Sequence, residues 1–256
     1  IRENPDTYGN YSYQCVGRFT RGEDVINCFH GTAHGSENFT KSFAKSCNAS
    51  FANISVMLDR PSYGDTLEKL LFNCDLPVSF AYNKSKVIMD ETVSDSDVMQ
   101  ASIGQGTDQI TPLHMNMITA AIANDGILMK PYLIDRIEND NGNIMKQFSP
   151  EPYGSLMSQD EAEALTKLMS EVVESGTATK LKGLSYTAAG KTGSAEYNSD
   201  KSDSHAWFTG FAPVEDPQIC VTIIIEGAGS GGDYAVPIAR RIFNAWLEPG
   251  DGGSGS

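Results

Sequence analysis

The chain has 256 residues, with 19 basic side chains (Lys and Arg), 33 acidic side chains (Asp and Glu) and a formal net charge of −14 at pH 7. A field of this sign repels phosphate, which excludes a nucleic-acid-binding protein held by backbone contacts. Hydrophobic residues make up 40% and charged residues 20%, the mix of an ordinary soluble globular protein. No apolar run approaches the roughly 18 residues that indicate a membrane-spanning helix.

The first 35 residues are polar and rich in turn-forming residues. Gly9 and Gly22 stand in two such turns, and short stretches with apolar residues flank the second one. We expect residues 1–35 to form a loop-rich excursion with one short hairpin, made of Tyr11–Phe19 and Val25–Phe29.

Helices are expected after this excursion. Ser36 is placed to cap a helix that runs towards Lys45, and a second helix begins near Asn48. A further short helix is expected at Leu67–Leu71, and residues 73–100 are expected to be irregular.

The middle of the chain carries clearer signals. Pro112 suits the first turn of a helix, where its missing N–H costs nothing. Tyr132–Met145 predicts a hairpin with a primed turn. Ser158 and Glu161 form a capping box, in which a hydroxyl and a carboxylate three residues later satisfy the first backbone N–H groups of a helix.

Three strands and a helix close the chain. The third strand is apolar at consecutive positions, so we expect it to be buried on both faces. Helices followed by antiparallel strands and a final helix indicate an α+β fold, in which helices flank an antiparallel sheet. These last elements are expected at Thr187–Glu196, His205–Ala212, Ile219–Glu226 and Ala235–Leu247.

The triplet Lys191-Thr192-Gly193 lies on the first of these strands. The lysine supplies positive potential, the hydroxyls of Thr192 and Ser194 can bind a carboxylate, and Gly193 lets a substrate backbone lie close to the strand. A phosphate-binding loop is excluded, because no glycine completes the pattern before Gly190 and no helix follows.

A second triplet, Ser46-Cys47-Asn48, stands at the expected junction of two helices. A hydroxyl and an amide one residue apart can face the same cleft at such a break. Taken alone, the triplet is typical of a helix cap.

In this order the two triplets match the last two of the three motifs of β-lactamases and penicillin-binding proteins, which are Ser-x-x-Lys, a Ser-x-Asn type and Lys-Thr-Gly. From about His34 to Leu247 the chain resembles class B penicillin-binding proteins of the penicillin-binding protein A and division/sporulation type. Five other stretches carry the same resemblance: Ala101–Gly106, Thr111–Met115, Ala121–Gly126, Val173–Ala178 and His205–Pro213.

The resemblance implies a three-layer serine transpeptidase fold spanning residues 36–247, with a flexible tail at 248–256. It implies an enzyme at the outer face of a bacterial membrane that cross-links peptidoglycan stem peptides ending in D-Ala-D-Ala. A serine acyl-enzyme carries the reaction, β-lactams trap it, and no cofactor is required.

The resemblance also assigns roles to single residues. Ser46 would relay a proton towards the leaving amine, and Asn48 would hold the substrate amide. Lys191 would polarise the Ser46 hydroxyl. Thr192 and Ser194 would bind the terminal carboxylate, and the Ser194 N–H would form half of an oxyanion hole.

The first family motif, which holds the attacking serine and its lysine, has one literal match here. It is Ser42-Phe43-Ala44-Lys45, which lies inside the helix leading into the second triplet and one turn before Ser46, so we reject it as the nucleophile. We expect the nucleophile and the first strands of the sheet on a removed segment or a separate chain. There are two alternatives. One is a permuted or engineered chain in which Gly252–Ser256 joins the missing part to this one, and the other is an incomplete gene. In each case residues 1–256 alone are not expected to acylate.

Five cysteines occur, and two of them lie near histidines. Cys15, Cys28 and His34 could bind a structural zinc ion through two thiolates and an imidazole, with His30 between them. The short Cys-x-x-Cys knuckle is absent, so a Cys15–Cys28 disulfide and free thiols remain open.

Two other functions stay open on the sequence. One is a non-catalytic module of the same fold that binds peptidoglycan or division partners. The other is a β-lactamase or β-lactam sensor, which the match over Ala101–Leu128 disfavours.

Overall fold

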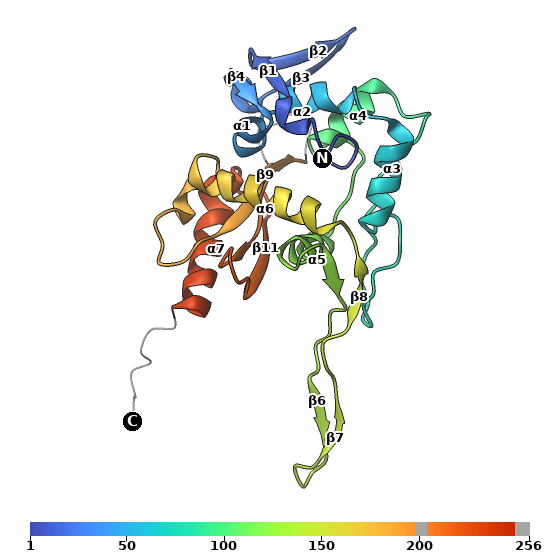
Figure 1. Ribbon diagram of the computed structural model, residues 1–256, viewed down its shortest axis with the longest axis vertical. Helices are drawn as coiled ribbons and strands as arrows, with labels where there is room; N and C mark the ends of the chain where they lie inside the picture. Colours follow the sequence, from blue (N-terminus) through green and yellow to red (C-terminus); the bar gives the residue numbers. More distant parts are fainter. Residues whose placement is uncertain (198–203, 249–256) are drawn as a thin grey trace.

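The computed structural model describes residues 1–197 and 204–248, so residues 249–256 of the expected tail lie outside this range. Figure 1 shows the N-terminal excursion at one end of the molecule, a body of helices and strands in the middle, and a long hairpin that projects at the other end. The terminal helix α7 lies against the body on the side away from helices α3 and α4.

The central sheet consists of three antiparallel strands in the order β11-β10-β9, as expected. The strands are β9 (Ala189–Glu196), β10 (Ser204–Ala212) and β11 (Ile219–Ile225). All seven residues of β11 are half-buried, so the expectation of burial on both faces was wrong. Helices contact β11 on both faces, but within the described residues it pairs with β10 alone, which leaves its outer edge uncovered.

Helices cover both faces of this sheet. On β10 the Phe208 ring meets Phe243 of α7 (Gly231–Leu247), while the neighbouring Thr209 hydroxyl meets Thr119 of α5 (Pro112–Ala123) at 2.7 Å. Neighbouring strand residues point to opposite faces, so α7 and α5 form the two outer layers. The α+β, three-layer arrangement is therefore confirmed.

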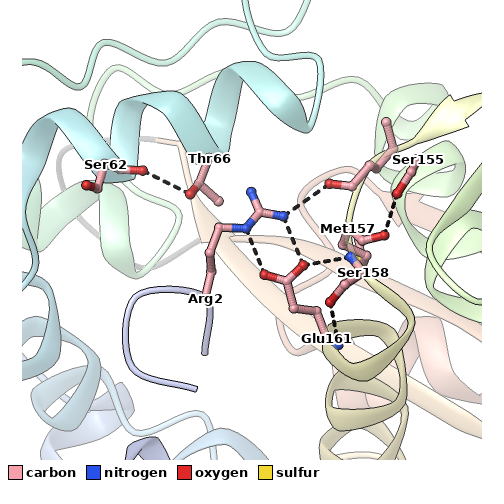
Figure 2. Close-up of polar contacts among 8 residues, drawn as sticks. Arg2, Ser62, Thr66, Ser155, Met157, Ser158 and Glu161 are labelled. Carbon is pink, nitrogen blue, oxygen red and sulfur yellow. Dashed lines mark hydrogen bonds and ion pairs between the residues drawn. The ribbon is translucent and has the colours of Figure 1, made fainter. Parts of the chain in front are cut away.

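Helix α6 (Gln159–Glu174) lies beside α5 and carries the expected capping box at Ser158. Arg2 joins the start of the chain to this box, as Figure 2 shows. Its Nε lies 2.7 Å from Oε1 of Glu161, and its Nη2 lies 3.3 Å from the Leu156 carbonyl oxygen. The Arg2 guanidinium holds the pKa of Glu161 at about 2. One carboxylate thus caps α6 and fixes the first residues of the chain.

The N-terminal excursion differs from the expected single hairpin. A two-stranded sheet joins β1 (Ser12–Cys15) to β4 (Gly35–Asn38), and a hairpin joins β2 (Arg18–Arg21) to β3 (Asp24–Asn27). Ser36 pairs with Gln14 inside β4 and therefore caps no helix. The cap is Asn38, whose side chain accepts a hydrogen bond from the Lys41 N–H at 2.8 Å.

Four helices follow the excursion, and two of them correct the expectations. Asp59 caps a helix that begins before the expected Leu67–Leu71, and Ser94 caps a helix inside the stretch expected to be irregular. The helix capped by Asp59 buries none of its residues, so its sequence has no apolar face from which a helix could be predicted. The four helices are α1 (Phe39–Ala44), α2 (Asn48–Ser55), α3 (Arg60–Lys69) and α4 (Asp95–Ser102).

The hairpin expected between Tyr132 and Met145 is confirmed, but the primed turn is not. The Gly142 N–H donates to the Asn139 carbonyl oxygen at 2.9 Å, and of the turn residues only Gly142, after the two central ones, has a positive φ. The outer part of the hairpin is β6 (Arg136–Glu138) paired with β7 (Ile144–Gln147), and its base is β5 (Ile127–Met129) paired with β8 (Pro152–Ser155). All residues of β6 and β7 are exposed, and Figure 1 shows the outer part standing clear of the body. The hairpin is therefore remote from the central sheet.

Candidate active site

A cleft of about 940 Å³ opens between strand β9 and the junction of α1 with α2. The structure brings both triplets to this cleft, although they are far apart in the sequence. Six of its lining residues are Ser46, Asn48, Lys191, Thr192, Gly193 and Ser194, which are all the catalytic and substrate-binding residues expected from the sequence.

Ser46 sits at the break between two helices. Its φ of 53° lies in the left-handed region, which an L-residue adopts rarely and which reverses the chain between α1 and α2. Cys47 then caps α2, and its sulfur accepts a hydrogen bond from the Ser50 N–H at 3.4 Å. The triplet therefore caps a helix, as expected, and also places the half-buried Ser46 at the cleft.

Lys191 connects the two triplets. Its Nζ donates to Oγ of Ser46 at 2.5 Å and to the Thr192 carbonyl oxygen at 2.9 Å, and it lies 5.7 Å from the centre of the Phe43 ring. Burial lowers the pKa of this lysine to about 8. An ammonium with that pKa exchanges its proton near neutral pH more readily than an exposed lysine does.

Asn48 is the first residue of α2 and is held from the N-terminal excursion. Its side-chain amide donates to the carbonyl oxygen of Asn27, the last residue of β3, at 3.1 Å. The excursion thus supports one wall of the cleft, and its Asn27–Thr32 segment lines the cleft directly.

The hydroxyls of Thr192 and Ser194 are each held by a neighbouring element. Oγ1 of Thr192 lies 2.5 Å from Oγ1 of Thr177, and Oγ of Ser194 accepts from the N–H of Gly231, the first residue of α7, at 3.3 Å. A Cβ at Gly231 would lie 2.4 Å from the Gly193 carbonyl oxygen, so only glycine allows this approach. Both hydroxyls therefore line the cleft near the N-terminus of α7, which carries the positive end of the helix dipole.

Sequence reasoning assigned no role to Thr177 or Gly231. Both act through contacts with segments distant in the chain, so no local pattern revealed them. The only signals available were the helix end that carries Thr177 and the pair Gly231-Gly232.

Ser42 is inside α1, as expected, and its side chain is fully buried. Its hydroxyl accepts a hydrogen bond from Ser50 Oγ at 2.7 Å. Lys45, the lysine of the same literal motif, donates to the Ser175 carbonyl oxygen. The motif match at Ser42 is therefore a structural part of α1, and the cleft has no access to its hydroxyl.

The three metal-ligand candidates of the sequence come together with a fourth. The ligand atoms of Cys15, Cys28, His34 and Cys47 all lie within 4.8 Å of one another. Sγ of Cys28 is 3.7 Å from that of Cys15 and 3.8 Å from that of Cys47, and Nδ1 of His34 is 3.5 Å from Cys15 Sγ. His30 is exposed, and its ring packs at a tilt of 56° against the Phe29 ring instead.

Cys47 is the middle residue of the Ser46-Cys47-Asn48 triplet, so this cluster directly adjoins the cleft. Sequence reasoning missed it because its spacing from Cys28 matches no metal motif. Cys15, Cys28 and Cys47 are all free thiols in the structure, and a Cys15–Cys28 disulfide is not formed. A single disulfide would also leave the buried Cys47 without a partner.

The electrostatics of the cluster suit a cation. A hydrogen bond from the Cys47 thiol lowers the pKa of Cys28, with help from the Ala49 N–H, and this favours the thiolate form of Cys28. The buried carboxylate of Glu37 lies beside Cys47, and neither of its oxygens has a hydrogen-bond partner among the described residues. Three thiols and an imidazole in one buried space form a donor set that zinc prefers.

Comparisons with known proteins match most of the chain. A family model described as the penicillin-binding protein transpeptidase domain matches residues 8–244. The peptidoglycan D,D-transpeptidase PbpA of Mycolicibacterium smegmatis is 32% identical over 226 residues, which cover 82% of this chain and 44% of that protein. The peptidoglycan D,D-transpeptidase MrdA of Haemophilus influenzae is 32% identical over 170 residues, 59% of this chain and 26% of that protein.

Solved structures show the same fold. The D,D-transpeptidase domain of a peptidoglycan glycosyltransferase from Eggerthella lenta superimposes with a TM-score of 0.87 at 26% identity, covering 94% of this chain and 60% of that one. Penicillin-binding protein A from M. tuberculosis, as a ceftriaxone acyl-enzyme complex, has a TM-score of 0.83 at 24% identity, covering 93% and 56%. The chain thus spans about half the length of these relatives. With its family match over residues 8–244 and its fold, the chain belongs to the penicillin-binding protein transpeptidase family.

Proposed function

We propose that the protein containing this chain is a peptidoglycan D,D-transpeptidase, and that residues 1–256 supply two of the three parts of its active site. The observation that carries the proposal is the contact between Lys191 Nζ and Ser46 Oγ, which unites motifs 145 positions apart at one cleft. The names of the similar proteins support the same reaction.

The arrangement fits a serine acyl transfer. The attacking serine, supplied from outside residues 1–256, bonds to the carbonyl carbon of the penultimate D-Ala, and the peptide C–N bond breaks. The proton that the attacking serine loses is relayed through Ser46, which Lys191 polarises, to the departing D-Ala amine. An acceptor amine then attacks the ester carbon and the ester C–O bond breaks. The proton that this amine loses returns by the same relay and restores the serine hydroxyl.

The remaining residues position the substrate. Asn48 holds the stem-peptide amide, and the hydroxyls of Thr192 and Ser194 bind the terminal carboxylate beside the N-terminus of α7. A β-lactam carries an equivalent carboxylate and leaves an acyl group on the serine. Stem peptides are the class of substrate with these groups, and they lie outside the cytoplasmic membrane, where we place the domain. None of the helices within residues 1–197 and 204–248 has the length and apolar character needed to cross a membrane.

Covalent labelling tests the reaction. The full-length protein is incubated with a fluorescent penicillin and separated under denaturing conditions. We expect a stable adduct, and we expect Ser46→Ala and Lys191→Gln to slow its formation by about 100-fold, since removing one proton-transfer group typically costs this much.

The same assay separates the alternatives. A β-lactamase would release the adduct within minutes, as measured by nitrocefin turnover. A non-catalytic binding module would show saturable, reversible binding and no adduct at all, which would contradict the proposed transpeptidase.

We further propose that Cys15, Cys28, His34 and Cys47 hold one structural zinc ion. The donor set, its burial and the lowered pKa of Cys28 support this assignment. The ion would connect four short segments: β1, the residue before η2 (Phe29–Gly31), the residue before β4 and the residue that caps α2. It would have a structural role and no part in the acyl transfer.

Metal analysis tests the zinc proposal. Protein purified without chelators should contain one zinc per chain, and Cys28→Ser should lower this content below half. Cys74→Ser is the matched control, because Cys74 lies outside the cluster and should keep full zinc content. A metal-free protein with a Cys15–Cys28 disulfide by mass spectrometry would refute the proposal.

A further inference from the structure

The C-terminal turn of α6 touches both walls of the cleft. The backbone N–H of Thr177 donates to the Ala44 carbonyl oxygen of α1 at 3.2 Å. Its hydroxyl lies 2.5 Å from that of Thr192 on β9. A single residue thus bridges the helix that leads into Ser46 and the strand that carries Lys191.

Neighbouring residues lock this turn in place. A Cβ at Gly176 would lie 2.3 Å from the Ala44 carbonyl oxygen, so α1 and the turn meet backbone to backbone. A Cβ at Gly232 would lie 2.6 Å from the Thr177 carbonyl oxygen, which brings the start of α7 against the other side of the turn. The Lys45 ammonium adds a bond to the Ser175 carbonyl oxygen. The turn that carries Thr177 is therefore held by two elements, α1 on one side and α7 on the other.

We propose that Thr177 is a positioning residue for carboxylate recognition, which rests on the proposed function. Thr192 has one hydroxyl hydrogen, and a carboxylate can bind it only if that hydrogen points into the cleft. When the Thr177 hydroxyl donates to Thr192 Oγ1, the Thr192 hydrogen is directed away from Thr177 and remains available to the ligand. Thr177 thus orients the Thr192 hydroxyl toward the carboxylate without itself contacting the ligand.

Paired ligands with and without a carboxylate test the proposal. In the full-length protein, acylation by benzylpenicillin is compared with acylation by its methyl ester. For Thr177→Val we expect the half-saturating benzylpenicillin concentration to rise roughly tenfold, the size of one lost hydrogen bond to a charged ligand. The limiting acylation rate should stay within about twofold, and the ester should react as with the unsubstituted protein.

Matched variants separate positioning from stability. Thr177→Ser retains the hydroxyl and should restore the preference for benzylpenicillin over the ester. Thr119→Val removes a similar hydroxyl pair, between α5 and Thr209, away from the cleft and should leave the preference unchanged. Thr177→Val and Thr192→Val should be strongly non-additive in a double-mutant cycle.

Other outcomes overturn the assignment. Equal losses for both ligands would show a merely structural role, and unchanged kinetics would show no role. If Thr177→Val does not fold, Thr177→Ala takes its place in every comparison. An unsubstituted protein that fails to acylate with either ligand would overturn the proposed function itself, and this result is distinct from a failure of Thr177 alone.

Discussion

At the scale of single residues, Lys191 has the most consequential environment. Its ammonium donates to Ser46 and to a backbone carbonyl in a setting whose burial lowers its pKa to about 8 from 10.5. The charged form therefore costs more in the folded protein than in the unfolded chain. Below pH 8 this cost is fully present, and it disappears as the pH rises from 8 to 10.5.

We therefore predict that Lys191→Met stabilises the protein at pH 7, because it removes the buried charge. The difference in the free energy of unfolding between variant and unsubstituted protein should shrink steadily between pH 8 and pH 10.5. Urea unfolding at pH 7, 9 and 10.5 measures this difference. A difference that stays constant with pH would show that the folded pKa of Lys191 is not lowered.

The residues that line the cleft were predictable where a motif carries its own chemistry. Ser46, Asn48 and Lys191 came from two triplets, and their meeting at one cleft required only that the fold be the expected one. Cys47 and Thr177 were not predictable, because each works through residues far away in the sequence. The sequence around Cys47 and Thr177 gives no indication that Cys47 contacts the sulfur of Cys28 or that Thr177 contacts the hydroxyl of Thr192.

At the scale of elements, the start of α6 shows how one charge supports a helix and a chain end. Glu161 accepts from Arg2 and from the Ser158 N–H, and its pKa of about 2 lies below its ordinary value of 4.5. The stabilisation is complete above pH 4.5 and is lost as the pH falls towards 2.

We predict that Glu161→Gln, which keeps an oxygen for capping, lowers the free energy of unfolding by about 1–2 kcal/mol at pH 7, discounted for the partial exposure of the pair. The deficit should vanish near pH 2, as followed by urea unfolding across this range. Glu163→Gln on the same helix serves as control and should be neutral. A deficit that persists at pH 2 would show that packing of the side chain, and not its charge, matters.

The zinc proposal also belongs to this scale, because four short elements meet at the cluster. We predict that removing the metal speeds amide hydrogen exchange in β1, β4 and the first turn of α2, while β10 and α5 keep their protection. Exchange followed by mass spectrometry, before and after chelation, gives this map. Equal protection throughout would contradict a structural role for the ion.

Elements were predictable where local signals were strong, as for α5, α6 and the three strands. The pairing of β1 with β4 was missed, because it joins segments separated by a whole hairpin. Helix α3 was mostly missed, because it buries none of its residues and has Gly64 in its middle. A Cβ there would lie 2.3 Å from the Met89 carbonyl oxygen, so tertiary contact explains this glycine.

At the scale of the whole molecule, the site depends on the body and the excursion, and the hairpin stands apart (Figure 1). We predict that replacing residues 135–147 by a short turn changes the free energy of unfolding by less than about 1 kcal/mol, since these strands bury little surface. Penicillin acylation by the full-length protein should keep its rate. A large loss of acylation rate would contradict this prediction and show that the hairpin affects the structure of the cleft.

The central claim is that residues 1–256 contribute Ser46 and Lys191 to an acyl transfer whose attacking serine lies elsewhere. Mass-spectrometric mapping of the benzylpenicillin adduct on the full-length protein tests it most directly, with residues 1–256 alone run in parallel. We predict an adduct on a serine outside residues 1–256, and none on the isolated chain. An adduct on Ser42 or Ser46 would contradict the account.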